Sequence, residues 1–174
     1  MRPAWLLLVV GACRLGFDPW QRPAADGAGG DAGVADSHDA RPASCAASYS
    51  FSYGTSRYRY AGTDQWLNSE IDCESDGAGM HLVVVDDAAE LAAIASLPGM
   101  TMTWVGTSDR ITAGTWRLVT GPVATYLPWA ASQPAALPCV SWNPATGTFA
   151  AEDCAQARGR VCECDGVTVD KTSY

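Results

Sequence analysis

The sequence predicts an α+β domain held together by disulfide bonds. Three observations support this prediction: two helix-like segments lie in the first half of the domain, short apolar segments separated by turn residues fill the second half, and six cysteines are spread from position 45 to position 164. Helical periodicity followed by short β-type runs is typical of domains that segregate helices from an antiparallel sheet. One domain of common size and an appendage fit into 174 residues.

The first residues have the order of a short export signal. Arg2 precedes an apolar run from Ala4 to Val10 that is too short to cross a bilayer, and small residues then lead to Cys13. Val10-Gly11-Ala12-Cys13 resembles the lipobox of bacterial lipoproteins, in which the cysteine thiol carries diacylglycerol. We therefore expect residues 1–12 to be a lipoprotein signal peptide and Cys13 to be the lipid attachment site. The alternatives are a leader cut nearby, or a wrongly assigned start codon that leaves Cys13 as a spare thiol.

Residues 13–44 are expected to form a lipidated, disordered tether. From Asp18 to Ser44 the chain is dominated by Ala, Gly, Asp and Pro, which bury too little surface to offset the loss of chain entropy. The regularly spaced aspartates are not followed by the glutamate that a calcium loop needs. The expected location is therefore the cell envelope, at the outer membrane or cell surface, with the lipid anchor as the only membrane contact.

The domain is predicted to begin at Cys45, where aromatic residues and cysteines replace the composition of the tether. A first helix is predicted from Asp64 to Cys73, because Trp66 and Cys73 then share one side. Thr63 is the residue type that favours the N-cap position before it.

A strand and a second helix follow the first helix. The β-branched run from His81 to Val85 predicts the strand, and Asp86-Asp87 cap a helix that runs to Leu97 and ends at Pro98-Gly99. Beyond Gly99 the pattern breaks into short apolar segments, which predict strands at Thr103–Val105, Thr115–Val119, Val140–Trp142 and Arg160–Cys164.

Six cysteines remain once Cys13 is assigned to the lipid. An even number in an exported chain predicts three disulfide bonds, although spacing alone does not choose among the pairings. The alternative is a zinc site built from Cys139, Cys154, Cys162 and Cys164. Paired Cys-x-x-Cys knuckles are absent from the sequence, so we expect no metal.

Charge and composition disfavour two classes of function. The net charge of −8, with Lys171 as the single lysine, is unsuited to neutralising phosphate groups, so no nucleic acid is expected as a partner. Neither His38 nor His81 has an evident nucleophile or carboxylate partner, and the sequence holds no Gly-x-Ser-x-Gly turn. The chain is therefore not expected to be an enzyme.

A series of landmarks, taken in order, resembles the C-type lectin-like domain. They span about residues 45–165 and comprise Trp66-x-x-Ser69-Glu70-x-x-Cys73, Gly79-Met80-His81-Leu82, Glu90, Trp104-Val105-Gly106, Gly114-x-Trp116, Tyr126-x-x-Trp129, Pro134, Cys139, Cys154 and Val161-Cys162-Glu163. The resemblance implies two helices, two small antiparallel sheets and a long loop region within residues 45–166. Residues 167–174 are expected to be a disordered tail.

The resemblance also implies how the cysteines pair. The family pattern joins Cys73 to Cys162 and Cys139 to Cys154, which leaves Cys45 and Cys164 to close the ends of the domain. An exchange of partners between Cys162 and Cys164 stays open.

The calcium site of the sugar-binding members is expected to be lost. In those members a Glu-Pro-Asn or Gln-Pro-Asp triplet and a Trp-Asn-Asp triplet supply oxygen ligands. Here the first aligns with Gln133-Pro134-Ala135 and the second with Phe149-Ala150-Ala151, so that alanine replaces all of these oxygen-bearing side chains except Gln133. Calcium needs six to eight oxygens. We expect neither calcium nor any other cofactor.

Recognition would then depend on shape, aromatic rings and ordinary hydrogen bonds. The family buries the positions of Trp104, Trp116 and Trp129, whereas Trp142 is equally compatible with the core and with a ligand contact. The expected function is calcium-independent recognition of a glycan or protein ligand at the cell surface; the alternative is a structural or protein-interaction envelope lipoprotein that binds no sugar. The candidate ligand-binding residues are Trp129, Gln133, Trp142, Asn143, Glu152 and Asp153.

Overall fold

The structure, a computed structural model, describes residues 45–174. The predicted signal peptide, Cys13 and the tether lie outside the described residues. Among residues 45–174, no helix has the length and apolar character needed to cross a membrane.

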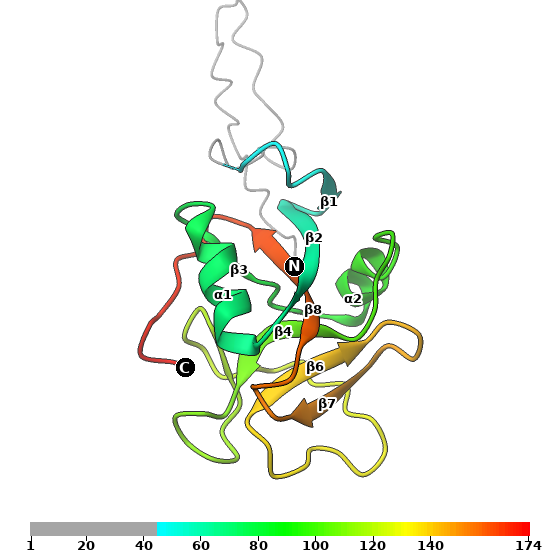
Figure 1. Ribbon diagram of the computed structural model, residues 1–174, viewed down its shortest axis with the longest axis vertical. Helices are drawn as coiled ribbons and strands as arrows, with labels where there is room; N and C mark the ends of the chain where they lie inside the picture. The colour runs from blue at the N-terminus through cyan, green and yellow to red at the C-terminus, as the bar shows by residue number, and fades with distance from the viewer. Residues whose placement is uncertain (1–44) are drawn as a thin grey trace, which may run out of the picture. The chain divides into compact units, whose positions relative to one another are not determined.

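A mixed sheet carries the core of the domain (Figure 1). The strands are ordered β1 (Phe51–Tyr53), β2 (Ser56–Asp64), β8 (Arg158–Cys164), β4 (Thr103–Ser108), β6 (Cys139–Asn143) and β7 (Thr148–Glu152), while β3 (Met80–Leu82) pairs with β8 and β5 (Arg117–Leu118) with β4. The predicted α+β class is confirmed. The two predicted small sheets are joined into one, because β4 and β8 pair in parallel at Thr103–Gly159 and Trp104–Arg160.

Helix α1 (Trp66–Ser75) begins two residues later than predicted. Asp64 stays in β2, where it pairs with Arg158 of β8, so the strand extends through the predicted cap Thr63. The Asp64 carboxylate then accepts hydrogen bonds from the backbone N–H of Gln65 at 2.7 Å and from the side-chain amide of Asn68 at 3.0 Å. Strand pairing thus overrides the local capping preference of Thr63.

Helix α2 (Ala88–Ile94) has the predicted N-cap. The Asp87 carboxylate accepts hydrogen bonds from the backbone N–H groups of Ala89 and Glu90, both at 2.8 Å. The helix ends before Leu97, because the amide of Leu97 bonds to the carbonyl of Ile94 three residues back and tightens the last turn. In Figure 1, α1 and α2 lie on either side of β2 and β8.

Gly106 lies inside β4, where the chain approaches a neighbouring segment closely. The Gly106 amide donates to the carbonyl of Val83 at 2.7 Å, which draws β4 close to the segment that follows β3. A Cβ atom at this position would lie 2.5 Å from the carbonyl oxygen of Leu82 and 2.8 Å from a methyl group of Val119. Only glycine permits this close approach of two backbones.

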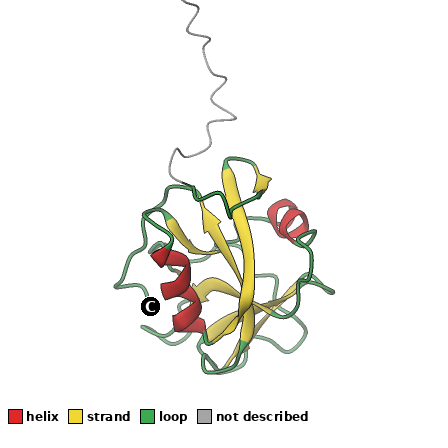
Figure 2. Ribbon diagram, turned by 45° about the horizontal axis from the view of Figure 1, so that its top comes forward, coloured by secondary structure: helices red, strands yellow, loops and turns green. Residues whose placement is uncertain are grey.

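The predicted disordered tail, residues 167–174, is held against the domain at Ser173 and Tyr174, and the C-terminus lies beside α1 in Figure 2. The Tyr174 ring meets the Trp66 ring edge-on, with centroids 5.5 Å apart, and its hydroxyl donates to the carboxylate of Glu74 at 2.6 Å. Ser173 is buried, and its hydroxyl donates to the carbonyl of Asp170 at 2.8 Å. A terminal aromatic residue that finds a ring on α1 is the physical reason for this order.

Candidate functional site

Three disulfide bonds fasten the loops and the chain ends to the sheet. They join Cys45 to Cys164, Cys73 to Cys162 and Cys139 to Cys154, with Cα–Cα distances of 5.9, 5.3 and 5.2 Å. The predicted pairing is confirmed, and Cys162 and Cys164 do not exchange partners. None of these thiols is left to hold a zinc ion.

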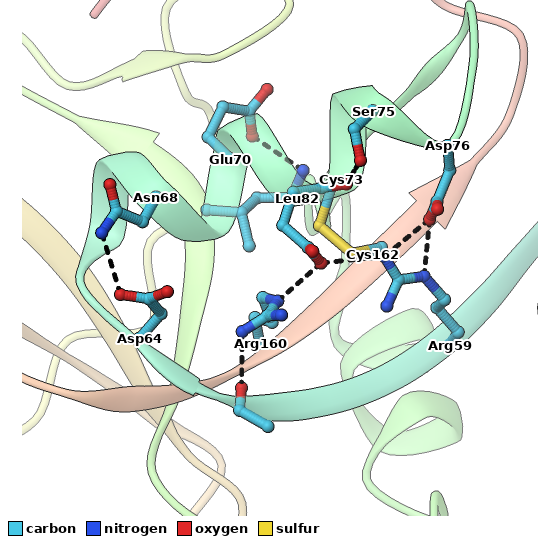
Figure 3. A network of polar contacts seen from close by, with 12 residues as sticks. Arg59, Asp64, Asn68, Glu70, Cys73, Ser75, Asp76, Leu82, Arg160 and Cys162 are labelled. Carbon is cyan, nitrogen blue, oxygen red and sulfur yellow. Dashed lines mark hydrogen bonds and ion pairs between the residues drawn. A yellow bond between two sulfur atoms is a disulfide. The ribbon is translucent and has the colours of Figure 1, made fainter.

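The arginine-rich strands β2 and β8 are tied to α1 by ion pairs (Figure 3). Arg59 and Arg160 each contact the carboxylate of Asp72 at 2.9 Å, and Arg59 also contacts Asp76 at 2.6 Å. The Cys73–Cys162 bridge lies within the same group of contacts. These arginines are therefore part of the packing between α1 and the sheet.

The positions that align with the calcium ligands do not fit a calcium ion. The side-chain oxygen of Gln133 accepts hydrogen bonds from the backbone N–H groups of Ala135 and Ala151, both at 2.9 Å. Ala135, Ala150 and Ala151 contribute no side-chain oxygen. The Gln133 oxygen, which alone remains of the aligned ligand oxygens, is thus already engaged by two backbone amides. One of these bonds attaches the loop to Ala151 of β7.

The candidate ligand residues are not all brought together. Trp142 is wholly buried, so its prediction as a contact residue is wrong and its core interpretation holds. Asn143 forms the turn after β6, where its side-chain oxygen accepts from the amide of Ala145 at 3.0 Å. Asn143 pairs with Thr148, whereas Glu152 pairs with Cys139 at the opposite end of the β6–β7 hairpin. Four residues of strand, about 13 Å, separate the two ends.

Glu152 and Asp153 leave β7 beside the Cys139–Cys154 bridge. The carboxylate of Glu152 pairs with Arg158 at 2.7 Å. Asp153 is exposed, and its carboxylate accepts a hydrogen bond from the amide of Ala155 at 3.0 Å. Asp153 therefore contributes an accessible negative charge at this end of the sheet.

Trp129 is half-buried and anchors the long loop. Its ring lies 4.9 Å from the ring of Trp116 and 6.4 Å from the ring of Phe149, measured between centroids. Trp116 is almost fully buried. The aromatic residues thus form a packed layer beneath the loop, as the family resemblance implies for Trp116 and Trp129.

A cavity of about 470 Å³, which we name the long-loop pocket, lies between residues 109–116, which follow β4, and residues 134–138, which precede β6. Its lining includes Trp116 from the first segment and Pro134, Ala135 and Leu137 from the second. The backbone N–H of Asp109 donates to the carbonyl of Pro138 at 3.0 Å, and the Asp109 carboxylate accepts from the amide of Gly114 at 2.7 Å. These bonds hold the two segments at a fixed separation.

Sequence reasoning missed this pocket. Its walls are made of alanine, glycine and proline residues that resemble loop spacers, and only the fold brings the two segments together. A further cavity of about 330 Å³ lies beside the tail, but there Glu74 and Lys171 pair with each other. The long-loop pocket is therefore the better candidate for ligand binding.

Residues 62–164 match the family model of the lectin C-type domain. The chain belongs to this family. Over 111 residues it is 30% identical to regenerating islet-derived protein 4 of Rattus norvegicus, a match that covers 58% of this chain and 68% of that protein. The C-type lectin domain extends from β2 to β8, so the family match includes both helices and the whole long loop.

Solved C-type lectin folds superpose on the domain. The C-type lectin CEL-I from Cucumaria echinata has a TM-score of 0.62 at 21% identity, over 68% of this chain and 96% of CEL-I. A calcium-independent type II antifreeze protein has a TM-score of 0.62 at 21% identity, over 68% of this chain and 92% of that protein. Together with three disulfide bonds, membership of this family indicates an exported protein.

A buried histidine of the C-type lectin domain has carboxylate partners that the sequence did not reveal. His81 is fully buried; its Nδ1 lies 2.8 Å from the carbonyl oxygen of Leu82 and its Nε2 lies 3.2 Å from the carboxylate of Asp165. Burial acts to lower the pKa of His81, but the hydrogen bond to Asp165 and the charge of Glu163 outweigh it and raise this pKa to about 9. The expectation that His81 lacks a carboxylate partner is wrong.

Replacing Glu70 with glutamine is expected to make the stability of the domain less dependent on pH. Burial raises the pKa of Glu70 to about 7, although the amide of Leu82 donates to its carboxylate at 2.8 Å. Because this folded-state pKa lies above the unfolded value of about 4.3, wild type loses stability as pH rises from about 4.5 to 7. The loss is about 3 kcal/mol, and it is absent from Glu70→Gln.

Urea unfolding of both proteins at pH 5 and pH 8 measures this difference. Asp153→Asn, at an exposed carboxylate, serves as the control and should keep the wild-type dependence. Equal losses of unfolding free energy in wild type and Glu70→Gln would show that Glu70 does not titrate in this range.

Proposed function

We propose that the chain is an exported, lipid-anchored protein whose C-type lectin domain recognises a ligand without calcium. The observation that carries this proposal is the state of Gln133, whose side-chain oxygen is held by two backbone amides while alanine occupies the other aligned positions. The calcium-independent type II antifreeze protein supports the proposal, since its fold is the same. Cys13, as the lipid attachment site, would place the domain at the cell surface.

The ligand face is the long-loop pocket together with the loop around Trp129. The loop around Trp129 and residues 134–138 of the pocket belong to the long loop region that connects β5 to β6. Residues 109–116 of the pocket follow β4 directly. The hydrogen bonds of Asp109 and Gln133 fix the backbone of this region without a metal. A prearranged loop can bind its ligand without first losing conformational freedom.

Millimolar calcium is expected to leave the melting temperature of the purified protein unchanged. A ligand that binds the native state stabilises it, and calcium at a hundred times its dissociation constant would add about 2.7 kcal/mol. Differential scanning calorimetry with calcium and with a chelator measures the effect. A clear rise in melting temperature with calcium, reversed by the chelator, would contradict the proposal.

A second function, protein binding without sugar recognition, is favoured by the apolar character of the long-loop pocket. Trp116, Pro134, Ala135 and Leu137 offer carbon atoms where a sugar would need hydrogen-bonding groups. A glycan array probed with the fluorescently labelled protein distinguishes the two. Binding of glycans would support carbohydrate recognition, whereas a silent array together with peptide binding would support a protein ligand.

A further inference from the structure

We propose that the long-loop pocket receives an apolar side chain of a protein ligand, and that a basic side chain of the same segment lies against the acidic rim beside it. This inference rests on the proposed function and names the class of its ligand.

The first argument is the shape and lining of the pocket. Its volume of about 470 Å³ accommodates a large apolar side chain with neighbouring backbone. Trp116 and Leu137 both line it, and Leu137 remains 42% exposed. Burying an apolar side chain in such surroundings contributes about 1.5 to 3 kcal/mol. The exposed Leu137 adds apolar surface that a ligand in the pocket can bury.

The second argument concerns the polar groups of the lining. The Asp109 carboxylate accepts from the amide of Gly114, and the Asp109 amide donates to Pro138. The guanidinium of Arg110 lies over the ring of Trp66, 5.8 Å from its centroid. Only Asp109, Arg110 and Trp116 have side chains in the lining that can form hydrogen bonds, so several hydroxyls of a sugar buried here would go without partners, at a cost of about 1 to 3 kcal/mol each. An apolar side chain incurs no such cost.

The third argument is the charge at the rim. Ser108 of β4 pairs with Cys139 of β6, which in turn pairs with Glu152 of β7. Asp109 and Asp153, which follow Ser108 and Glu152, therefore lie at the same end of these strands. Two strand spacings, about 10 Å, separate their chains there. Fourteen acidic and seven basic side chains among residues 45–174 give the domain a net charge of −7. Arg110 contributes one positive charge to the lining, but the negative net field favours a ligand segment that carries lysine or arginine next to the inserted apolar residue.

The experiment selects ligands from a random-peptide display library with the purified full-length protein as the target. Enriched sequences are expected to carry an apolar residue next to lysine or arginine. Their affinities for wild type, Leu137→Lys and Leu67→Lys are then measured by fluorescence polarisation. Leu67 lies on α1 with an exposure of 38%, so Leu67→Lys makes the same change on an equally exposed leucine outside the pocket.

Leu137→Lys is expected to weaken binding of the selected peptides at least tenfold, because it removes an apolar wall residue and repels a basic ligand. Leu67→Lys should leave the affinity unchanged, and circular dichroism checks that both variants fold. Equal binding to wild type and Leu137→Lys, or enrichment of acidic peptides, overturns the inference.

The glycan array separates failure of this inference from failure of the proposed function. If the protein binds glycans, Leu137→Lys abolishes that binding and no peptide is enriched, the proposed binding function would stand. The inference of a protein ligand would be overturned. Silence of both the array and the library would contradict the binding function itself.

Discussion

Replacing Cys73 and Cys162 together with alanine is expected to lower the free energy of unfolding by about 4 to 5 kcal/mol. The two cysteines are 89 residues apart, and a bridge that closes a loop of this length removes a large amount of chain entropy from the unfolded state. Because small domains have total stabilities of about 5 to 15 kcal/mol, this loss brings the domain close to unfolding. Urea unfolding monitored by tryptophan fluorescence measures the effect.

The Cys139–Cys154 bridge provides a matched control within the same domain. It spans only 15 residues, so replacing both cysteines with alanine should cost about 3 kcal/mol, less than the loss of the longer bridge. If removal of the short bridge proves more damaging, loop entropy is not the main contribution, and the attachment of the long loop to β7 matters more.

Replacing His81 with glutamine is expected to destabilise the domain by about 3 to 5 kcal/mol, the range seen when one partner of a buried ion pair is removed. Glu163 is buried, and its carboxylate accepts from the amide of Val84 at 3.0 Å. Without the imidazolium, Glu163 either remains an uncompensated charge or must take up a proton. Chemical denaturation at pH 7 measures the loss.

A double-mutant cycle tests this pairing directly. The double variant, with His81→Gln and Glu163→Gln, should lose less unfolding free energy than the two single variants together, because it leaves no unpaired charge at either position. The contribution of His81 should disappear as pH rises through about 9, since its folded-state pKa is raised, and it should weaken below about pH 7, where Glu163, whose pKa burial raises to about 7, takes up a proton. Additive single changes, or a contribution independent of pH, would contradict a charged His81.

Much of the fold could be predicted because some of its signals come from neighbouring residues and others are family residues that occur in a fixed order along the sequence. The Asp87 cap depends on two neighbouring amides. Strands β2 and β7 were missed for different reasons. In β2 the buried Tyr58 lies between Arg57 and Arg59, and two charged residues are untypical of a strand in the middle of a sheet. In β7 the alanines have weak β propensity, and pairing with β6 decides the conformation.

The candidate site was harder to predict because its residues come from separate segments of the sequence, and the fold determines which of them lie close together. The separation of Asn143 from Glu152 follows from the register of one hairpin, which the spacing of residues does not show. The burial of Trp142 follows from its cross-strand pairing with Phe149. Most of the residues that line the long-loop pocket are alanine, glycine or proline, which have no functional signature, so the pocket is recognised only when residues 109–116 and 134–138 are brought together in the fold.

The Cys45–Cys164 bridge determines how a mechanical load would travel through the molecule. Tension applied at residue 45 passes through a covalent bond to the end of β8 and does not have to pass through the hydrogen bonds between β1 and β2. From β8 it spreads to β2, β3 and β4, which all pair with that strand. A ligand pulling on the loop after β4 would thus work against the interior of the sheet, and the β1–β2 hairpin would not peel away first.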